Sequence, residues 1–253
     1  MNAATSTLKT DAYNMIRQML IDGELPLGSL ISEISLAKQI GIGRTPVREA
    51  ISQLQHEGVV ERVPRLGTIV RKPDMSEIIE LYDVREALEC YAVGRVTGKL
   101  PAEHLAQLKL LNEQINKIAE DMKTNNVEWL EGEMLKRALA LDLGFHMIIL
   151  RGVGNRRLMK MVGDSRVLMR IFRCSRQTHS YDVISRVYEH HERIRKAIVA
   201  GEPAKAVELM AEHIQTSKRE TIERFNRTQG VESILQSVEI DLDEDLLSDL
   251  SSA

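Results

Sequence analysis

Apolar residues recur at helical spacing in the first quarter of the chain. Between residues 8 and 22 they fall three or four positions apart, which is the period of one face of an α-helix. A second such run follows Ser32, whose hydroxyl can cap a helix, and ends at Gly41. A third run occupies residues 44–57 and stops at a glycine. The pattern therefore predicts three helices near the N-terminus.

The pattern turns from helical to extended after the third predicted helix. Two short β-type runs, 59–63 and 68–70, flank the sequence PRLG at residues 64–67, which is typical of a hairpin turn. Three helices followed by a β-hairpin, with a glycine-containing turn between the last two helices, form a winged helix-turn-helix. In that motif the third helix enters the major groove of DNA with its N-terminal residues first. We expect this DNA-binding domain to occupy residues 1–73.

Helical spacing dominates the chain from residue 74 onward. It predicts six further helices at about 75–98, 101–122, 127–151, 156–177, 184–200 and 203–226. Because the breaks between them are short, successive helices are expected to run antiparallel. We therefore predict a mainly α fold, in which an antiparallel all-α helical bundle over residues 74–229 follows the winged helix-turn-helix. The segment 230–253 carries seven acidic residues and no basic ones, so we expect a mobile tail.

Composition limits the class of protein. The chain has 253 residues, 43% of them hydrophobic, and is long enough for two domains with cores of their own. It contains no apolar run of the roughly 20 residues that cross a membrane, and its N-terminus lacks the apolar core of a signal peptide. We therefore expect a cytoplasmic protein without a membrane segment. Cys90 and Cys174 have no metal-type spacing, and we expect two buried, reduced thiols.

Charge is distributed unevenly between the two predicted domains. Residues 1–73 carry nine Lys and Arg against seven Asp and Glu, a balance of +2. Residues 74–253 carry 25 against 30, a balance of −5, and the two add to the net charge of −3. Because the excess is small, a nucleic-acid site must depend on where the basic residues lie rather than on their number.

Two arginines, Arg44 and Arg48, lie near the start of the third predicted helix. A cation there opposes the helix dipole, which favours acidic residues in the first turn. Both arginines fall on the face opposite the apolar Val47, Ile51 and Leu54, so they can point at DNA. Arginine can bond guanine O6 and N7 or clamp a phosphate. The arrangement therefore indicates a DNA contact rather than a solvated surface.

Other residues around this helix are placed for the DNA backbone. Thr45 could cap the helix or bond a phosphate. Arg65 lies in the predicted wing, and Arg71 and Lys72 follow it. We expect these three basic residues to contact phosphate or the minor groove.

The segment from Pro26 to Lys72 closely resembles the DNA-binding domain of GntR-type bacterial transcription regulators. The resemblance rests on the run RTPVREA at residues 44–50, Leu54, Glu57-Gly58 and Gly67-Thr68. It implies DNA-binding residues at Arg44, Thr45, Arg48, Arg65 and Gly67. Many members carry an arginine after the Ser-Glu pair that opens the second helix, whereas Ile34 stands there in this chain.

Polar residues interrupt the apolar stripes of three predicted bundle helices. Asp142 and His146 share the inward face of helix 127–151, and His191 and His213 occupy inward positions on the last two helices. One inward histidine is usually a satisfied core residue, but four such groups would each cost about 1–3 kcal/mol if left unpaired. One divalent metal ion would satisfy all four. Nitrogen and oxygen ligands without a thiolate leave Zn²⁺, Ni²⁺, Mn²⁺ and Fe²⁺ open.

The region from about 75 to 225 resembles the FCD ligand-binding domain that accompanies the FadR-like branch of the GntR family. The motifs that carry the resemblance are Tyr82-x-x-Arg85-x-x-Leu88-Glu89, Asp142-x-x-Phe145-His146, Asn155, His191-x-x-Ile194-x-x-Ala197 and Met210-x-x-His213. Many members bind a metal through one aspartate and three histidines, which map onto Asp142, His146, His191 and His213. The resemblance also implies a small carboxylate or acyl compound as effector.

Arg85 falls on the inward stripe of helix 75–98. A buried arginine needs an anion. Glu89 one turn on, another core acid, or an effector carboxylate held between Arg85 and the metal would supply it. Arg170 and Arg173, which lie in a strongly basic segment, could reach the same cavity.

The sequence leaves three functions open. The first is a metal-containing repressor or activator that binds double-stranded DNA as a homodimer on a two-fold symmetric operator and responds to a small organic acid. The second is a metalloenzyme with a DNA-binding appendage, for which no second inward acid of the His-Glu-x-x-His kind is evident. The third is a constitutive DNA-binding protein whose metal is purely structural. We favour the first, a regulator that is not an enzyme.

Overall fold

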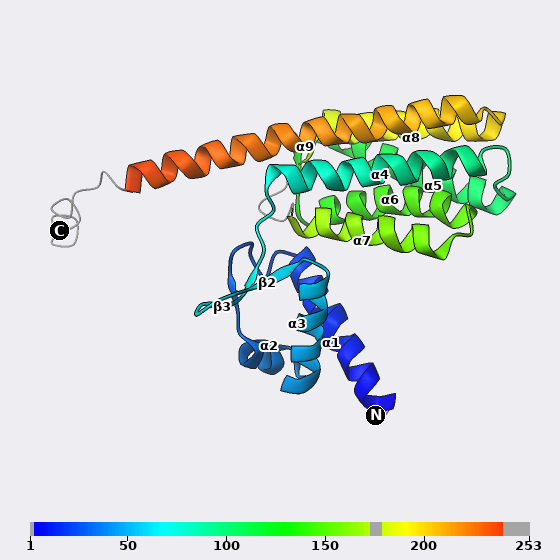
Figure 1. The fold of residues 1–253 in the computed structure, drawn as a ribbon. Coiled ribbons are helices and arrows are strands. Elements are labelled where there is room, and N and C mark those ends of the chain that lie inside the picture. Colours follow the sequence, from blue (N-terminus) through cyan, green and yellow to red (C-terminus); the bar gives the residue numbers. More distant parts are fainter. Residues whose placement is uncertain (1–2, 173–178, 240–253) are drawn as a thin grey trace.

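The computed structural model describes residues 3–172 and 179–239. Within them the chain forms a small N-terminal domain of helices and a short sheet, which lies beside a larger helical bundle (Figure 1). The predicted fold class, a winged helix-turn-helix followed by an all-helical domain, is confirmed. No helix in these residues is long and apolar enough to cross a membrane.

The N-terminal domain has the order helix, strand, two helices and a hairpin. Its elements are α1 (Ala3–Ile21), β1 (Leu30–Ile31), α2 (Glu33–Ile40), α3 (Arg44–His56), β2 (Val60–Val63) and β3 (Gly67–Val70). The antiparallel sheet has the order β1-β3-β2, with Val63 opposite Gly67 at the hairpin turn. Strand β1 was not predicted, because two residues are too few to show a β period.

Local sequence explains why α2 and α3 begin and end where they do. The hydroxyl of Ser32 accepts a hydrogen bond from the amide of Ser35 at 3.3 Å, as expected of an N-cap. Gly41 ends α2 with φ of 69°, a conformation that glycine adopts without strain. Pro46 lies buried in the first turn of α3, where it needs no amide hydrogen. The turn and the helix start thus fix the position at which α3 presents its N-terminus.

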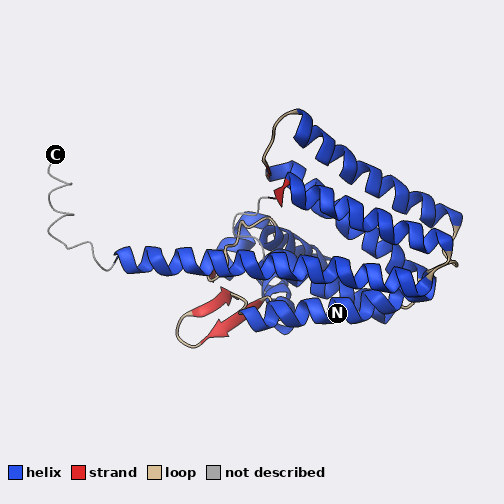
Figure 2. Cartoon of the chain, turned by 90° about the horizontal axis from the view of Figure 1, so that it is seen from above, coloured by secondary structure: helices blue, strands red, loops and turns tan. Residues whose placement is uncertain are grey.

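The bundle contains six helices and a small two-stranded ladder. Its elements are α4 (Met75–Val96), α5 (Ala102–Thr124), β4 (Trp129–Leu130), α6 (Gly132–Gly152), α7 (Arg156–Phe172), β5 (His179–Ser180), α8 (Tyr181–Ala200) and α9 (Pro203–Glu239). Helix α4 packs along α9, and α5 packs against α6 and α8. In both views α9 runs past the end of the bundle (Figures 1 and 2).

Several helix boundaries differ from the predicted ones, among them the starts of α1 at Ala3 and of α8 at Tyr181. Helix α6 begins at Gly132 rather than at 127, because residues 129–130 pair with 179–180 as strands. Helix α9 continues to Glu239 rather than ending at 226. Helix α7 is described to Phe172, and the predicted remainder of that helix lies outside the described residues. The expected tail lies in part outside them too, since residues 240–253 are not described.

The link between the domains is held by Arg71. Its Nη1 donates to the backbone oxygen of Gly58 at 2.9 Å, and its Nη2 pairs with the carboxylate of Glu77. Glu77 in turn completes a capping box with Asp74 at the start of α4. The expected contact of Arg71 with phosphate or the minor groove stays a prediction, and in the structure the side chain already has partners within the protein. The residue ties the end of the wing to the first turn of the bundle.

A second contact between the domains was not predicted. Ile171 and Phe172, at the end of α7, belong to the same buried cluster as Ile16 and Leu20 of α1. The hydrophobic core of the DNA-binding domain therefore includes side chains from the bundle. Helix α7 and the link to α4 together connect the two domains.

The cysteine expectation is met in part. Cys90 on α4 is free and half-buried, and burial raises the pKa of its thiol to about 11. The thiol therefore stays protonated at neutral pH. Cys174 lies outside the described residues.

Candidate metal centre and nucleic-acid interface

Three helices bring the four predicted metal ligands together. Asp142 and His146 come from α6, His191 from α8 and His213 from α9. Each offers one ligand atom, and these atoms all lie within 4.8 Å of one another. Such a cluster of one carboxylate and three imidazoles is the donor set of a divalent transition-metal site.

The geometry leaves nitrogen atoms of this cluster pointing at one another. Nε2 of His146 and Nε2 of His213 are 3.2 Å apart, and Nε2 of His191 lies 3.4 Å from Oδ1 of Asp142. The three imidazoles are buried, whereas 28% of the Asp142 side chain is exposed. Both ring nitrogens of His191 are buried, and among the described residues neither makes a well-aligned hydrogen bond beyond the 3.4 Å contact between Nε2 and Asp142. Buried polar atoms without partners are costly, and a metal ion at the centre would satisfy them, so the residues fit such an ion.

Two of the imidazoles, those of His191 and His213, have the protonation state that a metal requires. Burial lowers the pKa of His191 to about 4, although hydrogen bonding to Asp142 opposes the shift. Burial, followed by the charges of His191 and His146, holds the pKa of His213 well below its ordinary value. Both rings are therefore neutral at pH 7, and a neutral ring can donate its lone pair.

Asp142 is ionised in the same cluster. Burial would raise the pKa of this carboxyl, but hydrogen bonds with His146 and His191 and the charge of Arg166 outweigh burial. The pKa of Asp142 is consequently well below its usual range. The site thus offers one negative and several neutral donors.

Glu89 of α4 contacts the ring nitrogen of His146 that is turned away from the cluster. Its Oε2 lies 2.5 Å from Nδ1 of His146, and only 1% of the side chain is exposed. Burial disfavours its charged form, but Arg166, His146 and Arg85 hold the pKa of Glu89 well below its ordinary value. The carboxylate on Nδ1 orients the ring so that Nε2 faces the other ligands. Glu89 is therefore the second inward acid that the sequence reasoning did not recognise in this role.

The three effector residues predicted from the sequence have different surroundings. Arg85 is buried and its Nε donates to Oε1 of Glu89 at 2.9 Å, so its anion is the glutamate one turn on. Arg170 is not among the residues that line the cavity beside the cluster, and Arg173 lies outside the described residues. The arginine of α7 that reaches the cluster is Arg166.

Arg166 bridges the two buried acids. Its Nη1 lies 3.2 Å from Oδ2 of Asp142, and its Nη2 lies 3.0 Å from Oε2 of Glu89. Arg166 and Arg170 are four residues apart on one helical face, so spacing could not show which of them meets the site. Only the depth at which α7 packs decides between them.

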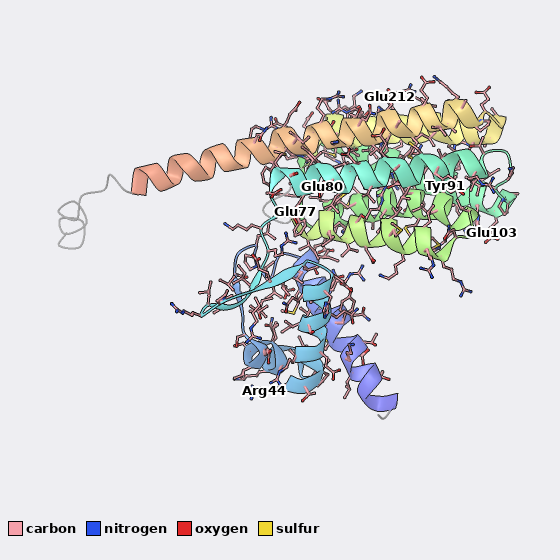
Figure 3. All side chains as sticks on the ribbon, in the orientation of Figure 1. Arg44, Glu77, Glu80, Tyr91, Glu103 and Glu212 are labelled. Carbon is pink, nitrogen blue, oxygen red and sulfur yellow. The ribbon has the colours of Figure 1, made fainter. Side chains whose placement is uncertain are left out.

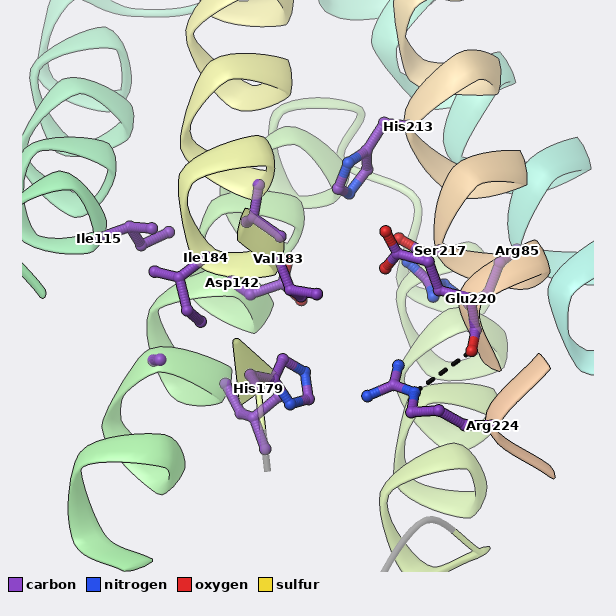
Figure 4. Close-up of a pocket in the computed structure, with 13 residues that line it drawn as sticks. Arg85, Ile115, Asp142, His179, Val183, Ile184, His213, Ser217, Glu220 and Arg224 are labelled. Carbon is purple, nitrogen blue, oxygen red and sulfur yellow. Dashed lines mark hydrogen bonds between the residues drawn. The ribbon is translucent and has the colours of Figure 1, made fainter. Parts of the chain in front are cut away.

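A cavity opens beside the cluster. Its wall combines apolar and charged side chains from α4, α5, α6, β5, α8 and α9: Arg85, Ile115, Ala138, Leu139, Asp142, His179, Val183, Ile184, Val187, His213, Ser217, Glu220 and Arg224. Figure 4 shows Asp142, His213 and Arg85 on this wall. The cavity volume is about 60 Å³, which is enough for a few water molecules or a small ligand. Two of the four candidate ligands therefore face a site that a small molecule can enter.

His190 is a buried histidine next to the cluster. The spacing places it about a quarter-turn away from His191. The structure nevertheless buries it, with 9% of the residue exposed, and puts its ring 5.5 Å from the ring of His213. It packs on a candidate ligand without belonging to the cluster.

The predicted DNA-reading residues lie on one end of α3 and on the wing. Arg44 and Thr45 are exposed at the N-terminus of α3, and Figure 3 shows Arg44 at the end of that domain away from the bundle. Arg65 is exposed in the hairpin turn with φ of 67°, and Gly67 follows with φ of 118°. Arg48 is also exposed, and its Nε lies 3.1 Å from Oε2 of Glu33. An exposed ion pair contributes little, so Arg48 can exchange this partner for a phosphate.

We predict that Glu89→Gln strongly destabilises the fold. The change leaves Arg85 and Arg166 buried without their carboxylate, and breaking a buried ion pair typically costs about 3–5 kcal/mol. Urea titration followed by circular dichroism should show this loss in the free energy of unfolding. Glu80→Gln, which changes an exposed glutamate of the same helix, is the matched control and should show little change. Equal stability of the two variants would refute the assigned role of Glu89.

We also predict that the metal-free protein loses stability as the pH falls from 6.5 towards 4. Unfolded His191 takes up a proton near its ordinary pKa of 6.5, whereas the folded ring does so only near pH 4. In this window the unfolded state binds more protons, so acid favours unfolding. Urea titrations with a chelator at several pH values should show the slope, and His191→Gln should make it shallower. A slope that this variant leaves unchanged would contradict the prediction.

Comparison with known proteins assigns both domains. Residues 80–216 match the FCD domain, and residues 8–70 match the bacterial regulatory proteins of the gntR family. The HTH-type transcriptional regulator LutR of Bacillus subtilis (strain 168) is 27% identical over 206 residues, which cover 78% of this chain and 93% of LutR. An uncharacterized HTH-type transcriptional regulator of Streptomyces ambofaciens is 42% identical over 60 residues. That match covers 24% of this chain and only about a quarter of the relative's length.

Solved structures share the fold. The chain superposes on E. coli McbR/YncC with a TM-score of 0.68 at 22% identity, covering 89% of this chain and all of that one. A putative GntR regulator from Rhodococcus sp. RHA1 gives a TM-score of 0.63 at 19% identity, covering 84% of this chain and 96% of the other. The FCD match alone covers more than half of the chain. The chain therefore belongs to the gntR family of bacterial regulatory proteins, in the branch that carries an FCD domain.

Proposed function

We propose that the protein is a transcription regulator that binds DNA as a homodimer and changes its DNA affinity when a small carboxylate binds at a metal centre in the bundle. The observation that carries the proposal is the convergence of Asp142, His146, His191 and His213 beside a cavity, in a chain whose other domain presents an arginine-led helix. Family membership supports a regulator rather than an enzyme.

The DNA-binding role rests on α3 and the wing. Arg44 and Arg48 would reach base edges or phosphates in the major groove, and Thr45 would bond a phosphate at the start of the helix. Arg65 and Gly67 would bring the hairpin turn to the DNA backbone. The exposure of Arg44, Thr45, Arg48 and Arg65 supports these roles.

A homodimer would double the DNA sequence that is read. One recognition helix contacts only a few base pairs, and two-fold pairing extends the site and mirrors it in the operator. Helix α4 offers an apolar surface for pairing, since 40% of Val84 and 52% of Tyr91 are exposed seven residues apart on one face. Figure 3 labels Tyr91 on α4.

The metal would be held by the carboxylate of Asp142 and by the imidazoles of His146, His191 and His213. A bound divalent ion supplies a positive centre that attracts oxygen donors. Zn²⁺, Ni²⁺, Mn²⁺ and Fe²⁺ all accept such a donor set. Glu89 would keep the ring of His146 turned towards the ion.

Arg85 is placed to bind the carboxylate of an effector. Its Nε donates to Glu89, its Nη1 donates to the sulfur of Met169 at 3.8 Å, and its guanidinium carbon lies 5.3 Å from the centre of the Tyr82 ring. The same guanidinium lines the cavity together with Asp142 and His213. The carboxylate of an effector in that cavity would therefore contact the guanidinium of Arg85 and lie beside the metal-binding residues at the same time.

Helix α7 would carry the signal to the DNA-binding domain. Arg166 holds Asp142 and Glu89, and Ile171 and Phe172 lie in the core of the other domain. A metal or effector that alters the pairing of Arg166 would shift the balance between two positions of α7. A tenfold change in DNA affinity needs only about 1.4 kcal/mol of such coupling.

We predict that Arg44→Ala weakens binding to the specific operator by about 1–3 kcal/mol, because a base or phosphate contact is lost. Fluorescence anisotropy with operator and scrambled duplexes measures the effect. Arg95→Ala, which changes an exposed arginine of the bundle, is the control and should bind as the unaltered protein does. An unchanged ratio of specific to nonspecific affinity in Arg44→Ala would contradict the groove placement.

We predict that His191→Ala or His213→Ala loses the metal, lowers thermal stability and abolishes the response of DNA affinity to carboxylates. Elemental analysis of protein purified without chelator, thermal melts and anisotropy with a panel of small carboxylates test the three effects. His56→Ala, at an exposed position of α3, should keep the metal. Metal retained in a His191/His213 double variant would rule out the proposed centre.

The same measurements separate the other two functions. A metal-loaded protein whose DNA affinity ignores every carboxylate would favour a structural metal. Carboxylate turnover that disappears in His213→Ala would favour a metalloenzyme.

A further inference from the structure

A second cavity lies between the two domains. Its volume is about 270 Å³. Residues of α1 and α7 line it together with the end of α3 and the residues that follow α3: Tyr13, Arg17, His56, Glu57, Val59, Lys160, Asp164, Val167 and Leu168. It shares no lining residue with the cavity at the metal centre. Domain interfaces are common places for small-molecule sites.

Arg17 lines this cavity and, among the described residues, its Nε lacks a hydrogen-bond acceptor. This Nε is buried, and no carboxylate of the described residues pairs with the guanidinium. The guanidinium carbon lies 6.0 Å from the centre of the Tyr13 ring, at the outer limit of a cation–π contact. A half-buried arginine in this state is a binding group for an anion.

The other charged groups of the wall already have partners. Lys160 pairs with Asp164 at 2.5 Å. Glu57 accepts hydrogen bonds from the hydroxyl of Tyr13 at 2.8 Å and from the amide of Gln53 at 3.1 Å. Burial and then Glu57 raise the pKa of Tyr13 to about 12, so this hydroxyl keeps its proton. The pair of Lys160 and Asp164 is exposed and weak, so the distinguishing feature of Arg17 is that it is half-buried and has no carboxylate partner among the described residues.

The remaining wall defines the shape and charge of that ligand. Val59, Val167 and Leu168 supply an apolar surface from both domains. Glu57 and Asp164 lie on the same wall and would repel a second negative charge. The cavity thus suits a molecule with one carboxylate and an apolar body.

We propose that the interdomain cavity is a second ligand site, which binds a small monocarboxylate through Arg17 and packs its apolar body on Val59, Val167 and Leu168. This site is independent of the metal centre and of the effector proposed there. Because its wall belongs to both domains, an occupant would stabilise their association in the observed arrangement.

Isothermal titration calorimetry with benzoate tests the proposal on the full chain. The His191→Ala variant removes the metal-dependent site, so binding that persists in it belongs elsewhere. We expect one benzoate per chain in this background and an affinity at least about tenfold weaker when Arg17→Gln is added, since a charged hydrogen bond is lost. Arg62→Gln, at an exposed arginine of the same domain, should leave the affinity unchanged.

Two further arms keep the test decisive. Leu168→Trp fills the cavity but leaves the residue at position 17 unchanged, and it should also abolish binding. Benzamide, which has no charge, and phthalate, which has two, should both bind more weakly than benzoate. The same titration of the otherwise unaltered chain with Arg17→Gln covers the case in which His191→Ala does not fold. The proposal is overturned if benzoate does not saturate the protein at millimolar concentration, or if Arg17→Gln and Leu168→Trp bind it as tightly as Arg62→Gln. Either result leaves the metal-dependent response untouched, so the two proposals fail separately.

Discussion

The buried carboxylate of Glu89 is the interaction on which the rest of the bundle depends. It accepts from Arg85 of its own helix, from Arg166 of α7 and from the ring of His146 on α6. Three helices are therefore fixed against one another by a single anion in a region that excludes water. Removing water from these charges is costly, and the cost is offset only when every partner is in place. This requirement sets the depth and rotation at which α4, α6 and α7 can pack.

The candidate metal centre follows from that arrangement. With Nδ1 of His146 held by Glu89, its Nε2 can only face the space shared with His213, His191 and Asp142. One carboxylate oxygen of Asp142 then faces the imidazole of His191, and the other pairs with the guanidinium of Arg166. A change at Asp142 would therefore be felt by Arg166, and through α7 by the core of the DNA-binding domain, where Ile171 and Phe172 are buried. The coupling needs no long-range mechanism beyond contacts between neighbouring side chains.

The described part of the chain contains two cavities of different chemistry. One is built around imidazoles and carboxylates inside the bundle, and the other around Arg17 at the boundary between the domains. A protein with both could respond to two signals, one that acts inside the bundle and one that acts directly on the domain contact. In each case the ligand can shift the balance only as far as it binds the two arrangements with different affinity.

The sequence by itself determined the elements and the chemistry of the site. Helical period, the Ser32 cap, Pro46 and the hairpin turn are local signals, and they predicted the winged helix-turn-helix and the bundle correctly. Periodicity also placed Asp142, His146, His191 and His213 on inward faces, because a helix fixes which residues share a side. Only the tertiary structure decided which side chains of neighbouring helices contact those inward faces. Three contacts depend on how far helices slide along one another: Arg166 rather than Arg170 reaches Asp142, Glu89 pairs with Arg85, Arg166 and His146, and Arg71 pairs with Glu77. The contact of α7 with α1 joins residues more than a hundred positions apart. No local pattern encodes such distances, because side-chain spacing repeats every turn and many offsets between two helices bury the same stripe equally well.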